Sequence, residues 1–163
     1  MKAIRIANNS DSNQSNVTAD VLAVIDAALT FCKVVVEYGS GDHTISIGQR
    51  LSGWGRLISI EHNRENYEIT QEALSKVNLP VTHILSEILS SQIPDESSRS
   101  SPSQLNHYVE EPSKHLHNEK ADLVLVQGQE KDKCASHAVN LLASSAESVG
   151  ETSSNSFRWR AFP

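Results

Sequence analysis

Three consecutive β-branched residues, Val34–Val36, constrain the fold of this chain more than any other feature. A run that is apolar at every position is typical of a strand that is covered on both faces, as in a parallel sheet. Three further short runs, each bounded by a turn signal, are of similar length. We therefore predict four strands, at residues 33–39, 55–63, 79–87 and 121–128.

Helical periodicity fills most of the intervals between these runs. The predicted helices span residues 18–32, 43–52, 64–78 and 133–146. Strands that alternate with helices indicate an α/β fold, and right-handed crossovers place such strands in one largely parallel sheet. We expect a three-layer α/β sandwich with a small sheet, because 163 residues are enough for about one domain.

Polar residues dominate the rest of the chain. We expect a polar arm at 1–17, a core domain at 18–147 and a tail at 148–163. Within the core domain, residues 90–120 are predicted to form a long polar connection with only weak local structure, of which residues 93–120 act as a mobile lid.

The sheet is expected to be shortened at its C-terminal end, because the tail offers only one strand, in "SFRWRAF". The sheet is then minimal, completed by another subunit, or cut short. An open edge beside the strand at 121–128 could pair with a second copy, so a homodimer is possible.

Charge and composition exclude several kinds of partner. A net charge of -6 does not suit a phosphate-binding face, so we expect no nucleic-acid partner. No apolar run approaches the ~18 residues of a membrane span, and the N-terminus lacks a signal pattern, so a cytoplasmic protein is expected. Cys32 and Cys134 are isolated in apolar surroundings, which predicts reduced, buried thiols.

The stretch "VVVEYGSGDHT" places Glu37 just before a turn that contains Gly39 and Gly41. Glycines after a buried strand let a ligand approach the backbone closely. A dinucleotide site requires a third glycine, but Thr44 stands near that position, and Glu37 would repel a pyrophosphate. A ligand that carries an amino group suits Glu37 better, and Glu61, which ends the next strand, suits a sugar diol.

These stretches, with "LISIEHNRENYE" and "DLVLVQGQEKDKCA", resemble the Rossmann-like class I methyltransferases that use S-adenosylmethionine (SAM). The resemblance covers residues 20–146. It implies that Glu37 lies near the methionine ammonium, that the backbone from Gly39 to Gly41 passes under the cofactor, and that Glu61 accepts from the ribose hydroxyls. The cofactor-binding residues implied in this way are Glu37, Gly39, Ser40, Gly41, Thr44, Glu61, His62 and Glu87.

The fourth strand departs from the pattern of this family. Gly128, Cys134 and Ala135 match it, but Gln127 and Gln129 replace the expected Asp and Arg. Because glutamine cannot act as a general base, two interpretations stay open: a methyltransferase and a non-catalytic binding or scaffolding module. A NAD-dependent oxidoreductase is disfavoured by Glu37 and by the two-glycine spacing.

Two residues are candidates for a direct catalytic role, His43 at the start of a helix beside the cofactor and Gln127. The acceptor would be a small molecule or a protein. His107, His115 and His117 lie in the polar connection without a third ligand at fixed spacing, so we expect no metal site.

Overall fold

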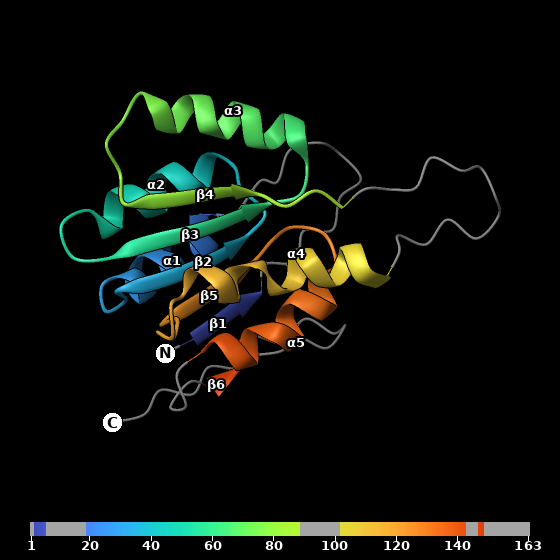
Figure 1. Cartoon of the computed structure of the whole chain (residues 1–163). Coiled ribbons are helices and arrows are strands. Elements are labelled where there is room, and N and C mark those ends of the chain that lie inside the picture. The colour runs from blue at the N-terminus through green and yellow to red at the C-terminus, as the bar shows by residue number, and fades with distance from the viewer. Residues whose placement is uncertain (1, 6–18, 89–101, 143–146, 149–163) are drawn as a thin grey trace.

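The computed structural model describes residues 2–5, 19–88, 102–142 and 147–148, and the side chains at 23–88 and 107–142. Six strands alternate with five helices in these residues (Figure 1). In chain order the elements are β1 Lys2–Arg5, α1 Ala19–Leu29, β2 Val34–Tyr38, α2 Asp42–Leu51, β3 Arg56–Glu61, α3 Arg64–Ser75, β4 Val81–Leu85, α4 Pro102–His115, β5 Leu123–Val126, α5 Lys131–Leu141 and β6 Glu147–Ser148.

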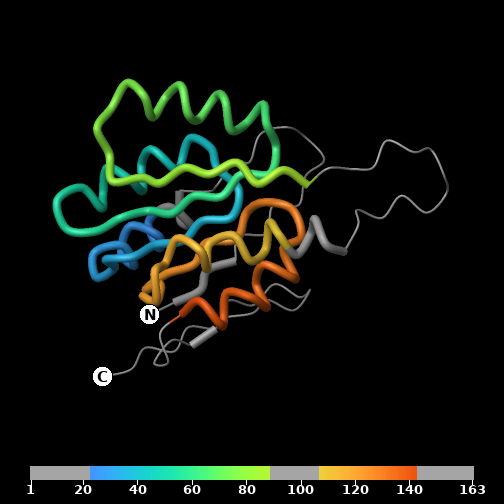
Figure 2. The backbone as a smooth tube through the Cα atoms, viewed as in Figure 1, coloured from blue at the N-terminus to red at the C-terminus, as the bar shows by residue number. Residues whose placement is uncertain are grey.

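All the strands run parallel in one sheet with the order β4-β3-β2-β5-β1-β6. β2 lies between β3 and β5, although most of the described chain separates β2 from β5 in the sequence (Figure 2). The carboxyl ends of β2, β3 and β5 therefore meet at one edge of the sheet.

Each face of the sheet is covered by helices, which confirms the three-layer sandwich. On one face, buried side chains of α1 and α2 pack on alternate strand residues such as Val35 and Leu57. On the other face, α4 and α5 pack on the intervening residues, among them Val36 and Ile58. This two-sided burial explains why the run Val34–Val36 is apolar at every position.

β1 was not predicted, because four residues at the start of a polar segment carry no clear periodic signal. It pairs with β5 from Lys2 to Arg5. The expected open edge beside the strand at 121–128 is therefore wrong, and a second copy cannot pair there. Most of the polar arm, including residues 7–17, lies outside the described residues, as does the tail after Ser148.

The long polar connection is also corrected, because residues 102–115 form α4. Few apolar residues mark this helix, but Tyr108, Val109 and Leu116 are buried against the sheet. The predicted lid is thus partly a packed helix, and residues 89–101 lie outside the described residues.

Both cysteines are free and buried, as predicted. Burial raises the pKa of Cys32 to about 11 and that of Cys134 to about 12, so both thiols are protonated at neutral pH. Within the described residues, no helix has the length and hydrophobicity needed to cross a membrane.

Candidate functional site

The turn that follows β2 crosses the backbone that follows β5. Gly39 has a φ of 88°, and a Cβ atom there would lie 2.6 Å from the amide nitrogen of Gly128. A Cβ atom on Gly128 would in turn overlap the hydroxyl oxygen of Tyr108. Only glycine fits at either position, because two backbones and a phenol group meet without room for another atom.

Glu37 ends β2 inside the protein, with 0% of its surface exposed. Its Oε2 accepts hydrogen bonds from Ser59 Oγ at 2.6 Å and from Thr44 Oγ1 at 2.8 Å. Thr44 Oγ1 also accepts from the amide of Gly41 at 2.9 Å, so Glu37 is linked to the glycine turn. Its Oε1 lies 2.9 Å from His43 Nε2, a contact with the distance of an ion pair but not the alignment of a hydrogen bond.

Glu61 ends β3 and is 1% exposed. Its Oε2 accepts from the amide of Ser40 at 2.7 Å and from Ser40 Oγ at 3.0 Å. Its Oε1 accepts from the amides of His62 and Asn63, both at 2.8 Å, and lies 2.9 Å from His62 Nδ1. Burial opposes ionisation, but these hydrogen bonds outweigh it and lower the pKa of Glu61.

Both acids are buried, and the protein's own donors cover each carboxylate. The sequence does place the acids correctly on neighbouring strands, since Glu37 and Ser59 share a register position on β2 and β3. Ser59 was missed, although a serine within an apolar strand, two residues before Glu61, is a recognisable signal.

His43 stands at the start of α2, and only 11% of its side chain is exposed. Burial alone lowers the pKa of an imidazole, but the neighbouring Glu37 carboxylate has the larger combined effect and raises the pKa of His43. The charged imidazolium is therefore favoured at this position, although the helix N-terminus disfavours a positive charge. His62 is 17% exposed, and its ring packs edge-on against Tyr108 at 5.7 Å.

Further polar atoms near this edge are buried without a hydrogen-bond partner within the described part of the chain. They are the Tyr108 hydroxyl and both amide atoms of Gln127, the residue that follows β5. Burial raises the pKa of Tyr108 well above its usual range, so the phenol is neutral and can only donate or accept a hydrogen bond. Tyr108 was missed because α4 was not predicted.

The remaining predicted residues do not join this cluster. Glu87, after β4, pairs with Arg64 through two hydrogen bonds of 2.9 Å. Gln129 is exposed, and Lys133 pairs with Glu130 at 3.3 Å. His107 and His115 both contact Glu111 on α4. Across the described part of the chain, no group of three or more His, Cys, Asp or Glu residues could hold a metal ion.

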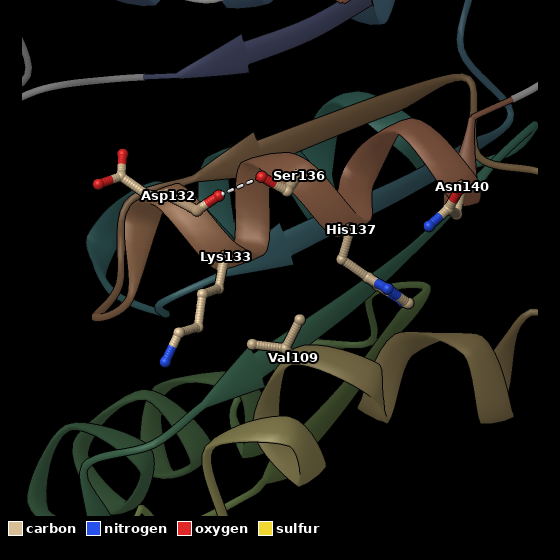
Figure 3. A pocket seen from close by; sticks show the side chains of 6 residues that line it. All are labelled: Val109, Asp132, Lys133, Ser136, His137 and Asn140. Carbon is tan, nitrogen blue, oxygen red and sulfur yellow. Dashed lines mark hydrogen bonds between the residues drawn. The ribbon is translucent and has the colours of Figure 1, made fainter. Parts of the chain in front are cut away.

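A cavity of about 420 Å³ lies between α4 and α5. Figure 3 shows Val109 of α4 opposite His137 of α5, with Ser136 donating to the carbonyl of Asp132 at 2.8 Å. The lining residues are Val109, Asp132, Lys133, Ser136, His137 and Asn140. None of the residues predicted to bind a cofactor lines this cavity.

Comparisons with known proteins bear on the fold. No protein-family model and no curated protein matches the chain. Among solved structures, a methyltransferase-like protein from Silicibacter pomeroyi is 18% identical, with a TM-score of 0.53 over 77% of this chain and 66% of that one. The O-methyltransferase TomG from Streptomyces achromogenes, involved in tomaymycin synthesis and solved with SAM, is 20% identical, with a TM-score of 0.51 over 75% of this chain and 49% of its own.

This chain thus spans about half to two thirds of the length of these structures. Identities of 18% and 20% are evidence for the fold, while function has to be argued from the site. The parallel sheet, the two helical layers and these likenesses agree with the resemblance that the glycine turn indicates. The protein therefore shares its Rossmann-like α/β fold with these two methyltransferase structures.

Proposed function

We propose that this protein is a cytoplasmic SAM-binding protein that transfers the methyl group to a small-molecule or protein acceptor. The observation that carries this proposal is the crossing of Gly39 and Gly128 directly beside two buried carboxylates. In open α/β sheets, ligands bind beyond the carboxyl ends of the strands, where this crossing lies.

The residues at the crossing fit the chemistry of SAM. Glu37 has one oxygen, Oε1, without an aligned hydrogen bond, and this oxygen suits the cofactor's ammonium group. The absence of Cβ atoms at Gly39 and Gly128 lets the two backbones cross in contact, which brings the end of β5 beside the glycine turn. The Gln127 amide and the Tyr108 hydroxyl, buried without partners, offer neutral donors and acceptors beside the same backbone.

Glu61 can accept hydrogen bonds from the ribose hydroxyls only if one of its present donors leaves, because its four hydrogen bonds use the lone-pair positions of a carboxylate. Three of those donors are backbone amides and are fixed. The fourth is Ser40 Oγ, a hydroxyl that can rotate away. We therefore infer that Ser40 Oγ rotates away from Glu61 Oε2 and that a ribose hydroxyl donates a hydrogen bond to this oxygen instead.

Methyl transfer requires little acid or base chemistry from the protein. When bound, SAM supplies a methyl group already activated by its sulfonium, so the protein's task is to position the acceptor. Gln127 in place of an acid therefore does not exclude catalysis. The non-catalytic alternative is favoured by the same residue, since its amide cannot remove a proton from an acceptor.

Isothermal calorimetry with S-adenosylhomocysteine and NAD tests the cofactor, and release of a labelled methyl group from SAM tests catalysis. We expect binding of S-adenosylhomocysteine and none of NAD. Gly39→Ala should weaken binding at least about tenfold, because the new Cβ separates the crossing backbones.

The matched control is Gly53→Ala, at a φ of 98° but with no atom within 4 Å of the new Cβ. It carries the same backbone strain and should bind normally. Binding of NAD, or absence of any adenosyl ligand from a folded protein, would overturn the proposal. Binding without methyl release to a broad set of acceptors would favour the non-catalytic alternative.

A further inference from the structure

The His43 side chain lies between the glycine turn and Glu37. A Cβ atom on Gly41 would be 3.2 Å from His43 Cε1, so the ring rests against the backbone of the turn. Its Nε2 lies 2.9 Å from Glu37 Oε1. The His43 side chain is 11% exposed and contacts the fully buried Glu37 carboxylate, so it lies between this carboxylate and solvent.

The two oxygens of Glu37 differ in what they contact. Oε2 is held by the Ser59 and Thr44 hydroxyls, which are both buried. Oε1 has the His43 ring beside it and no aligned hydrogen bond within the described structure. A ligand cation that reaches Glu37 must therefore take the place of this ring.

The surroundings favour a charged imidazole. On its own helix His43 is next to Asp42, and from β2 it faces Glu37, both of which favour the imidazolium. Two further groups interact electrostatically with Glu37, His83 on β4 and the neutral Tyr108 on α4. Burial opposes the charge, but the pKa of His43 is raised overall.

We propose that the His43 imidazolium is a built-in competitor that must leave Glu37 Oε1 before the ammonium group of an amino-acid-bearing nucleoside can bind there. This inference rests on the proposed function and adds a control on the same site. The exchange is balanced in charge. One cation replaces another at Glu37, and the displaced imidazole releases its proton to solvent.

Binding then depends on pH in a defined way. Between the ordinary pKa of a displaced imidazole, about 6.5, and the raised pKa of His43, affinity rises with pH by up to about tenfold per unit, because up to one proton is released for each ligand bound. At higher pH the ligand's own α-ammonium group loses its proton, so Glu37 no longer attracts it and affinity falls. The wild-type profile for S-adenosylhomocysteine is expected to be bell-shaped.

The experiment measures the affinity of S-adenosylhomocysteine from pH 5.5 to 9 for the wild type and for His43→Gln. In the variant, the increase of affinity with pH (the rising limb of the profile) should disappear, and the decrease at high pH (the falling limb) should remain. 5′-Methylthioadenosine, which lacks the ammonium group, should bind both proteins without the rising limb. His137→Gln, which removes an imidazole between α4 and α5, should keep the wild-type profile. Thermal unfolding of each variant checks its fold.

The possible outcomes separate the two proposals. If S-adenosylhomocysteine binds with no rising limb, or if His43→Gln keeps that limb, the competition is disproved and the cofactor assignment stands. If neither ligand binds the folded wild type at any pH, the cofactor assignment fails and the competition fails with it.

Discussion

The two buried carboxylates at the edge of this sheet are held in opposite ways. Glu61 is bound by three backbone amides, which cannot rotate away. Glu37 is bound by side chains only, from Ser59, Thr44 and His43. The difference indicates that Glu61 is part of the frame of the turn, whereas the surroundings of Glu37 can change with protonation or with a ligand.

The most disruptive test of this difference is to remove each carboxylate in turn. Glu61→Ala leaves three partly buried amides without their acceptor. Because an unsatisfied buried donor costs about 1–3 kcal/mol, and water can reach part of these amides, we expect a loss of about 3 kcal/mol in the free energy of unfolding. Glu37→Ala should cost less, because the freed hydroxyls can rotate toward other acceptors. Urea denaturation measures both, and equal losses would contradict the distinction.

A finer test removes one hydroxyl from each carboxylate. Ser59→Ala takes a 2.6 Å hydrogen bond from a fully buried acid and should destabilise the protein by about 1.5–3 kcal/mol, as expected for hydrogen bonds to charged groups. Ser40→Ala leaves Glu61 with its three amides and should cost less than about 1 kcal/mol. The reverse order in chemical denaturation would show that side-chain donors, not amides, hold Glu61.

Glu61 and the pair of Glu37 and His43 also predict different dependences of stability on pH. The pKa of Glu61 is lowered on folding, so its contribution is present above its unfolded pKa and is lost as pH falls through the folded value, in the acid range. The pKa of His43 is raised, so its contribution is present below the unfolded value near 6.5 and is lost as pH rises through the folded value. Thermal melts from pH 3 to 9 should show the alkaline loss disappear in Glu37→Gln.

The smallest effect is expected at Tyr108, whose side chain is buried near the two carboxylates. Its hydroxyl has no hydrogen-bond partner among the described residues, so Tyr108→Phe removes a buried polar group and breaks no hydrogen bond there. The free energy of unfolding should change by less than about 1 kcal/mol, in either direction. A loss of about 2 kcal/mol or more would reveal a partner for the hydroxyl and would remove Tyr108 from the groups offered to a ligand.

The sequence predicts the parts of this fold that have strong periodic signals. Four of the six strands and four of the five helices follow from apolar runs and helical spacing. β1 was missed because four residues carry little signal, and α4 because its buried side chains stand among polar and charged residues. Both elements are held by tertiary contacts, which local patterns do not contain.

The candidate site also has one part that the sequence predicts and one part that it does not. The glycine turn and both acids are recognisable from spacing, because parallel strands bring their carboxyl ends together. The covering of the acids depends on strand register and on the direction in which the turn folds back. The register places Ser59 beside Glu37, and the direction of the turn places the amide of Ser40 beside Glu61. No local sequence pattern determines either contact.

The crossing of Gly39 and Gly128 also has a consequence for biosynthesis. β2 receives its second neighbour only when β5 has been made, and the turn gains its closest contact at Gly128. A nascent chain that has emerged only as far as α4 therefore exposes an unpaired central strand, which is a hazard for aggregation. The ribosome must deliver nearly the whole described chain before this edge of the sheet can assemble.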